Sequence, residues 1–247
     1  MRFLIYTLIT LAIIIGIAVT TVPLGLVLGQ LGLGGLGVGW AHTEGTLYRG
    51  RVNGVFTQQQ VVGDIGLTLK PLSLFGGGLG YDIDMGGAGL RGTAGITLRP
   101  GQIELKDLRA RQSIAALEGL AAPIRAMGGE VRIADGDAVF GLQGCKQVSG
   151  SVTSDVLTRA AGQYGKVFGP ISGPLSCEDG LVVADLTSES PDGDVVRIFG
   201  RFGIGGQGDV RVEVETGDPA MAAFLSQANF SFQDDLWTYA YSARGAL

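Results

Sequence analysis

Apolar and polar positions follow two different patterns along this chain. Residues 3–22 carry no charge and are apolar apart from threonines, a glycine and one tyrosine. From Gly45 onward, apolar and polar residues alternate with a period of two, as in the segments that begin at Ile96, Ile103 and Val210. Such alternation is typical of β-strands with one buried and one wet face. The pattern predicts an apolar N-terminal helix followed by a β-rich domain.

Short turn signals separate the alternating segments. One of them is Arg99-Pro100-Gly101-Gln102, and the others are Asp135-Gly136, Asp179-Gly180, Asp192-Gly193 and the Gly-rich residues 205–208. Loops this short join antiparallel neighbours, whereas parallel strands need crossover helices for which the chain has no room. We therefore expect a mainly β fold, built around a curved and mostly antiparallel sheet.

Three segments interrupt the alternation and predict two or three short helices. Residues 113–127 are rich in Ala and Leu, and residues 154–168 begin with a Ser-Asp cap signal. The third segment, residues 218–228, has Asp218 at the cap position and Pro219 at the first helical position. These helices must cover part of the apolar sheet face. A final hairpin is expected across Asp234-Asp235.

The N-terminal apolar segment has the length of a membrane-spanning helix. About 20 apolar residues cross the roughly 30 Å hydrocarbon core of a bilayer, and Pro23 ends this run. A cleaved signal peptide is the alternative, but its apolar region is shorter, at about 7–15 residues. Because Arg2 is the only positive side chain nearby, the N-terminus is predicted to be cytoplasmic.

The predicted organisation is that of a single-pass membrane protein with its main domain outside the cytoplasm. It has a transmembrane anchor at residues 1–22, an apolar Gly-rich linker at residues 23–44 and a periplasmic β-rich domain at residues 45–247. Leu and Val residues at helical spacing predict a short helix in the linker, up to about Leu31. Trp40 fits either the membrane interface or the domain core.

Composition and charge exclude some classes of protein. The formal net charge is −5 and no basic stripe is present, so nucleic acid is not expected as a partner. Glycine accounts for 43 of the 247 residues, without a collagen period, and the apolar fraction of 46% argues against a disordered chain. This much glycine favours many turns and closely spaced strands.

The two cysteines, Cys145 and Cys177, are predicted to form a disulfide. Thiols in the bacterial periplasm are oxidised, so a single bridge is the simplest arrangement. A catalytic cysteine would need a base, and the sole histidine, His42, lies far away in sequence. Two thiols without nearby histidines also make a poor zinc site. Unpaired thiols are the remaining alternative.

No motif predicts an enzyme. Asp82 and Asp84 resemble part of a calcium loop, but the bidentate Glu of such a loop is missing, and their alternation fits the wet face of a strand. Residues 76–78 and 86–89 are Gly-rich, but they lie between strands and not between a strand and a helix, as a dinucleotide-binding loop requires. We expect no catalytic residue, no metal ligand and no cofactor.

A series of short motifs resembles the type II secretion system protein N family. Residues 45–50, Gly-Thr-Leu-Tyr-Arg-Gly, follow the predicted anchor, and a Leu-Lys-Pro strand and turn lies at residues 69–76. The second cysteine lies in a G-x-L-x-C-x-x-G motif at residues 173–180, and Asp218-Pro219 precedes Leu225 near the end. The departures are Tyr48, where Trp is common, and additional glycines in residues 29–39 and 76–80.

The resemblance implies an accessory protein of the inner membrane that faces the periplasm. Such a protein assists the export of folded proteins through an outer-membrane secretin, and the other secretion components are its expected partners. The family has no known enzymatic activity, so the resemblance assigns no catalytic residue.

The alternative function is lipid binding or transfer, similar to that of AsmA-like proteins. If the helices leave part of the apolar face open, the curved sheet would offer a groove for acyl chains, and lipid would be a partner. The other interpretation is that the apolar residues of this face form an ordinary hydrophobic core. The candidate lining residues are Ile96, Leu98, Ile103, Leu105, Val131, Ile133, Val210, Val212 and Val214.

Overall fold

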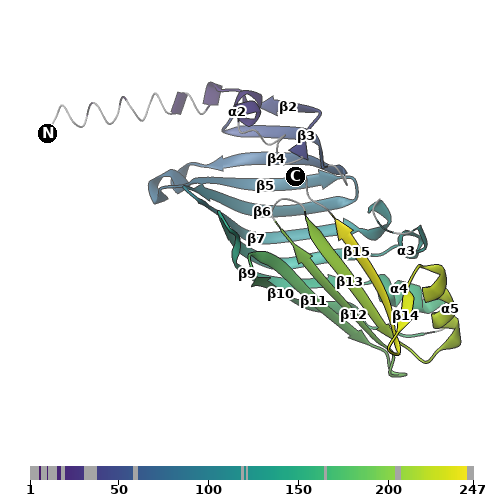
Figure 1. Cartoon of the computed structure of the whole chain (residues 1–247). Helices are drawn as coiled ribbons and strands as arrows, with labels where there is room; N and C mark the ends of the chain where they lie inside the picture. The colour runs from purple at the N-terminus through teal and green to yellow at the C-terminus, as the bar shows by residue number, and fades with distance from the viewer. Residues whose placement is uncertain are drawn as a thin grey trace.

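The described part of the chain forms one large antiparallel sheet with short helices (Figure 1). The structure is a computed structural model that describes residues 6, 10, 16–17, 20–30, 38–57, 61–117, 120, 122–163, 166–203 and 207–243. Within these ranges the 15 strands follow the order β1-β3-β4-β5-β6-β7-β8-β9-β10-β11-β12-β13-β15-β14, and β2 also pairs with β3. The predicted mainly β, antiparallel fold is confirmed.

Most strands pair with their neighbours in sequence. The first eight are β1 (Val38–Gly39), β2 (His42–Gly45), β3 (Arg49–Thr57), β4 (Val61–Lys70), β5 (Leu79–Gly87), β6 (Leu90–Arg99), β7 (Gln102–Ser113) and β8 (Glu130–Gly141). The others are β9 (Gly144–Ser154), β10 (Ile171–Glu178), β11 (Leu181–Glu189), β12 (Val195–Phe202), β13 (Gly208–Glu215), β14 (Ser231–Gln233) and β15 (Leu236–Ala243).

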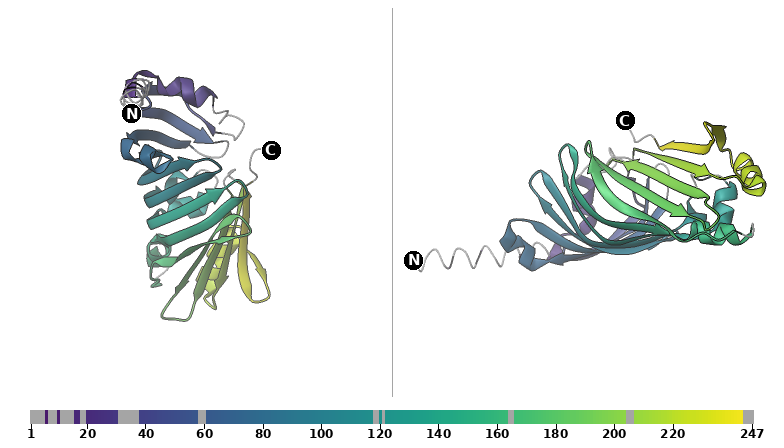
Figure 2. Two further views of the ribbon diagram at one scale, coloured as in Figure 1. Left: turned by 90° about the vertical axis from the view of Figure 1, so that its left-hand side faces the viewer. Right: turned by 90° about the horizontal axis from the view of Figure 1, so that it is seen from below.

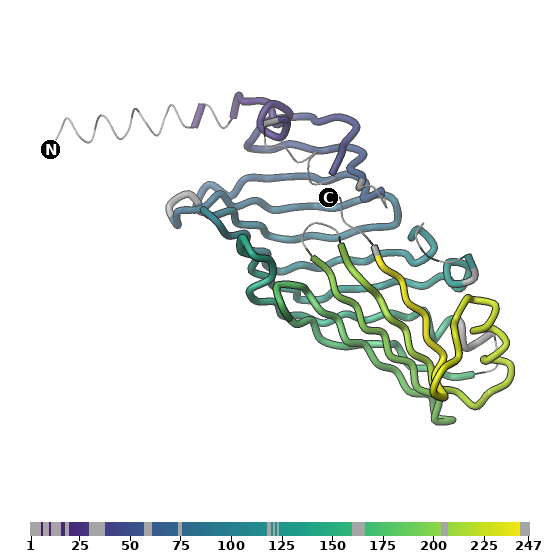
Figure 3. The backbone as a smooth tube through the Cα atoms, viewed as in Figure 1, coloured from purple at the N-terminus to yellow at the C-terminus, as the bar shows by residue number. Residues whose placement is uncertain are grey.

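The turns alternate between the two ends of the sheet, because each strand is antiparallel to the one before. One end, the tip end, carries the β4–β5 connection with the 3₁₀ helix η2 and the short turns β6–β7, β8–β9 and β10–β11. The other end, the helix end, carries the longer connections that contain α3, α4 and α5 (Figure 1). The sheet is also curved into a trough, so that the C-terminal strands lie over the middle of the sheet (Figure 2, Figure 3).

The helices are short and match the predicted segments in part. Asp218 caps the best predicted helix, and its Oδ1 accepts hydrogen bonds from the N–H groups of Ala220 (2.7 Å) and Met221 (3.2 Å). The segment predicted over residues 113–127 is not one helix but a 3₁₀ turn and a separate α-helix. The bounds are α2 (Leu24–Gln30), α3 (Ala122–Met127), α4 (Val156–Gln163), α5 (Pro219–Gln227), η2 (Pro71–Gly76) and η3 (Ile114–Ala116).

The turn predicted at Asp135-Gly136 is wrong, because β8 continues through both residues. Asp135 has a φ of 49°, and the register with β9 shifts between Ala134 and Asp137. A left-handed residue of this kind forms a β-bulge, which bends a strand without ending it. The hairpin predicted across Asp234-Asp235, in contrast, is confirmed as β14–β15.

The segment predicted as a linker contributes to the sheet. The short helix predicted there is confirmed as α2, and β1 and β2 lie within residues 23–44 and pair with β3. Leu24 of α2 is buried with Val52 and Val55, and Trp40 packs against this cluster. Trp40 therefore belongs to a core of the domain.

The predicted membrane anchor, residues 1–22, lies mostly outside the described residues. Those that are described are mainly helical, and the hydroxyls of Thr10 and Thr20 donate to the carbonyls of Tyr6 and Gly16, four residues earlier. Among the described residues, no helix combines the length and the apolar character that crossing a membrane requires. The anchor and the single-pass topology stay predictions.

Candidate functional site

The predicted groove residues lie on one face of the sheet, which we call the inner face. Directly opposite residues on neighbouring strands share a face. Leu98 is opposite Ile103 and Ile96 is opposite Leu105, while the pairing through Ala110 carries this face from β6 across β7 to β8. The registers of the remaining strands place Val131, Ile133, Val210, Val212 and Val214 on the same face. That these residues bind a ligand stays a prediction.

The helix end of the inner face is closed by a packed core. Ile171 is fully buried, and Val214 and Leu225 are 4% and 3% exposed in the same cluster. Three of the predicted groove residues, Val131, Ile133 and Val212, pack against this cluster, together with Leu157 of α4 and Met221 and Phe224 of α5. For these residues and Val214, the core interpretation is the better one.

The tip end of the inner face is open. Leu79, Leu98 and Ile103 lie directly opposite one another on β5, β6 and β7, and their side chains are 44%, 38% and 38% exposed. We call these three residues the apolar row. The described helices α3, α4 and α5 pack at the other end of the trough (Figure 1).

Two hollows lie on different faces of the sheet. An open hollow of about 570 Å³ is lined mainly by residues of the opposite, outer face of the sheet, among them Arg91, Thr93, Arg109 and Arg111. A smaller cavity of about 120 Å³ lies at the helix end between α3, α4, α5, β12 and β13, and all of its lining side chains are apolar.

Tyr81 shows how apolar this face is. It lies opposite Ile96 on the inner face, next to the apolar row, and is half-buried. Burial raises the pKa of Tyr81 above its usual value of 10.0, because the charged phenolate is poorly solvated there.

A partly buried cluster of charges joins segments of the helix end. Lys166 Nζ lies 3.0 Å from Asp194 Oδ2, 3.2 Å from Asp192 Oδ2 and 3.2 Å from Asp218 Oδ2. These carboxylates come from the β11–β12 turn and from the cap of α5. Hydrogen bonds to Asp194, Asp192 and Asp218, in that order, raise the pKa of Lys166 above 10.5.

The Asp218 carboxylate is stabilised as an anion by the same arrangement. The backbone N–H groups of Met221 and Ala220, and then Lys166, lower the pKa of Asp218 below 3.8. The stability that the charged Asp218 carboxylate contributes is present above about pH 3.8 and is lost as the pH falls through its lowered pKa. The Lys166 contribution is present below about pH 10.5 and is lost as the pH rises through the raised pKa.

Lys166→Met should lower the midpoint of thermal unfolding at pH 7, because three carboxylates would then share one site without a cation. The matched control is Lys70→Met, which removes a single exposed ion pair with Asp82 and should have little effect. The deficit of Lys166→Met should shrink as the pH falls through the lowered pKa of Asp218. Scanning calorimetry across pH measures both variants, and equal midpoints for the two variants at pH 7 would contradict this role.

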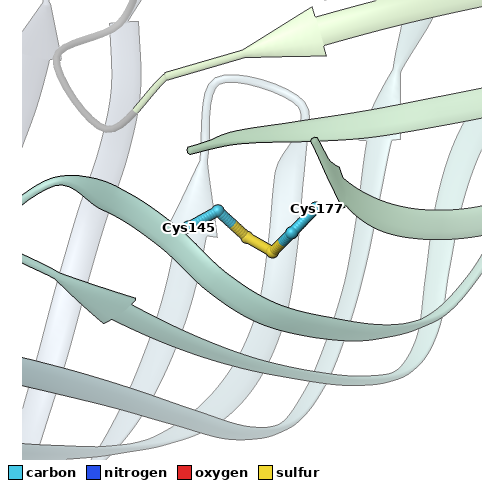
Figure 4. The surroundings of a disulfide bond; sticks show 2 residues. All are labelled: Cys145 and Cys177. Carbon is cyan, nitrogen blue, oxygen red and sulfur yellow. A yellow bond between two sulfur atoms is a disulfide. The ribbon is translucent and has the colours of Figure 1, made fainter. Parts of the chain in front are cut away.

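The predicted disulfide between Cys145 and Cys177 is present (Figure 4). The two Cα atoms are 5.7 Å apart, and the cysteines lie 32 residues apart in sequence. The assigned pairing of β9 with β10 ends at Pro174, opposite Ser151. Beyond that point the disulfide, and a 2.7 Å hydrogen bond from the Cys145 N–H to the Gly180 carbonyl, join the tip end of the two strands.

The outer face is polar and carries a row of arginines. Arg91, Arg111 and Arg132 lie directly opposite one another on β6, β7 and β8. Among the described residues only Arg132 of these has an ion pair, with Glu130 at 3.0 Å. Like charges directly opposite each other are unfavourable in a sheet. The sequence alone did not indicate this row, because the three arginines are far apart along the chain.

The other polar residues considered from the sequence lie apart from the inner face. His42 is exposed and contacts Glu44 and Asn53 at 3.2 and 3.0 Å, and Asp82 and Asp84 are exposed on β5. Among the described residues, no group of three or more His, Cys, Asp or Glu side chains is arranged to hold a metal ion.

Comparison with known proteins identifies the family. The described residues form a single β-sheet body with a partly open apolar face. A family model for type II secretion system (T2SS), protein N, matches residues 36–231, about four fifths of the chain. The chain belongs to this family, as the sequence motifs indicated. No curated protein and no solved structure matches it significantly.

Proposed function

We propose that this protein is a non-enzymatic accessory component of the type II secretion system, anchored in the inner membrane with its sheet in the periplasm. The observation that carries the proposal is the family match over residues 36–231. The Cys145–Cys177 disulfide supports an oxidising compartment such as the periplasm. In this role the protein assists the export of folded proteins across the outer membrane.

We further propose that the contact with other secretion components uses the free edge of the sheet. β14 pairs only with residues 236–238 of β15. On the side away from β13, residues 239–243 of β15 have no strand partner among the described residues. An unpaired strand edge can accept a strand from another protein through main-chain hydrogen bonds.

Deleting the gene should leave folded export substrates in the periplasm, because they reach that compartment but depend on the complete apparatus to leave it. The measurement is the share of one such substrate in the culture medium and in the periplasmic fraction. Expression of the full chain from a plasmid should restore secretion. Unchanged secretion in the deletion strain would contradict the proposed role.

A further inference from the structure

The predicted anchor joins the sheet without a flexible linker. The carbonyl of Val22, the last residue of the predicted anchor, accepts a 3.1 Å hydrogen bond from the N–H of Leu47, and Pro23 forms a β-bridge with Thr46. Both partners lie in the turn between β2 and β3. The chain is therefore fixed to the folded domain where the anchor ends. The place of this turn in the sheet decides which part of the domain lies nearest the membrane.

The β2–β3 turn lies at the tip end of the sheet. Arg49, at the start of β3, is opposite Thr68 near the end of β4, and the carbonyl of Tyr48 accepts a 2.8 Å hydrogen bond from the N–H of Leu69. β4 ends at Lys70, and η2 follows directly. Neighbouring strands are about 4.8 Å apart. The end of the anchor and the start of η2 are therefore separated by two strand spacings, roughly 10 Å.

Exposed apolar side chains are found at the same end of the sheet. Leu142, in the β8–β9 turn, is 92% exposed and Leu72 of η2 is 81% exposed, the two highest values for large apolar side chains among the described residues. Tyr48, beside the end of the anchor, is also exposed. Tyrosine is enriched where proteins meet the membrane–water interface. The end of the predicted anchor and the most exposed leucines therefore lie at one end of the domain.

We propose that the tip end of the sheet rests on the bilayer and that η2 inserts Leu72 into the membrane interface beside the anchor. This inference rests on the proposed anchoring in the membrane. The backbone of η2 suits such surroundings, because Ser73 Oγ donates to the Lys70 carbonyl (2.6 Å) and accepts from the Gly80 N–H (2.7 Å). The Ser73 carbonyl accepts from the Gly78 N–H (3.3 Å). Polar groups that are already paired cost less to bring into apolar surroundings.

The membrane fits this surface better than a partner protein does. Because no linker separates the anchor from the domain, the bilayer that holds the anchor lies within about 10 Å of η2, by the two strand spacings. A partner protein would have to enter between the tip end and that bilayer. In addition, β4 and β5, which flank η2, are each paired on both sides, so they offer no free edge to a strand of another protein.

Fluorescence quenching by spin-labelled lipids tests this contact in the full chain. Leu72→Cys, Val167→Cys and Ile17→Cys each provide one free thiol for the fluorophore NBD, because the native cysteines are bridged. The labelled chain is reconstituted into vesicles of phosphatidylethanolamine and phosphatidylglycerol, in which some lipids carry a nitroxide on the acyl chain near the headgroup. Val167 lies at the helix end, is 68% exposed and serves as the matched control. We expect several-fold stronger quenching at position 72 than at position 167.

The label at position 17 separates a failure of this contact from a failure of the anchor. Quenching at positions 17 and 72, with little at position 167, is the expected result. Quenching at position 17 but not at position 72 would overturn the contact of η2 and leave the anchor in place. The absence of quenching at both positions would overturn the contact and the anchor together. Equal quenching at positions 72 and 167 would also overturn the proposal, because the tip end would then have no preference for the membrane.

Discussion

Cys177→Ser should lower the free energy of unfolding by roughly 3–4 kcal/mol at pH 7, the loop-closure value for a bridge between residues 32 apart. The loss should be large because the assigned pairing of β9 with β10 stops at Pro174, so the disulfide is a main link between the tip ends of the two strands. The lower stability should reduce the amount of protein in the cell.

Denaturant unfolding with and without a reductant measures this contribution. Reduction should destabilise the wild-type protein by the same amount and leave the variant Cys145→Ser/Cys177→Ser unchanged. The matched control is Ser176→Ala, an exposed neighbour on the same strand, which should keep wild-type stability. A wild-type protein that is indifferent to reductant would show that the bridge contributes nothing.

Ile171→Ala should lower the free energy of unfolding by about 2–5 kcal/mol, because the change leaves a cavity in close-packed surroundings. Ile171 is 0% exposed and lies in the core cluster between the sheet and the helices. The midpoint of thermal unfolding should fall by roughly 2–4 °C for each kcal/mol in a domain of this size.

Leu98→Ala is the matched comparison on the open part of the same face. Leu98 is 38% exposed and belongs to the apolar row, so the change should cost about 1 kcal/mol or less. Calorimetry of both variants tests whether the inner face is closed at one end and open at the other. A loss for Leu98→Ala as large as that for Ile171→Ala would mean that the apolar row is packed core.

The sequence pattern predicts most of this sheet because alternation and turn residues are local signals. The same signals fail where residues typical of turns occur inside a strand. Asp135-Gly136 resembles a hairpin turn, yet the left-handed Asp135 forms a bulge inside β8. The strands β1 and β2 lie in a Gly-rich segment without a long alternating pattern, so that they depend on pairing with β3 rather than on local preference.

From the sequence, the candidate site could be predicted only as one whole face of the sheet. Alternation assigns Leu98 and Val214 to the same apolar side, but it cannot tell that Val214 is buried under the helices and Leu98 is not. That difference arises from where the connections between strands place their helices. The cluster around Lys166 was not predicted for a related reason, because its carboxylates come from segments brought together only by the fold.

The most direct test of the secretion role is a photocrosslink from the free edge of β15 in cells with an active secretion system. The photoreactive residue replaces Ser242, an exposed residue of the unpaired edge segment, or Asp185, an exposed residue on β11, which is paired on both sides. The proposed function predicts adducts to other secretion components from position 242 and not from position 185. Adducts to lipid or to the chain itself alone, or equal adducts from both positions, would contradict a contact made through the sheet edge.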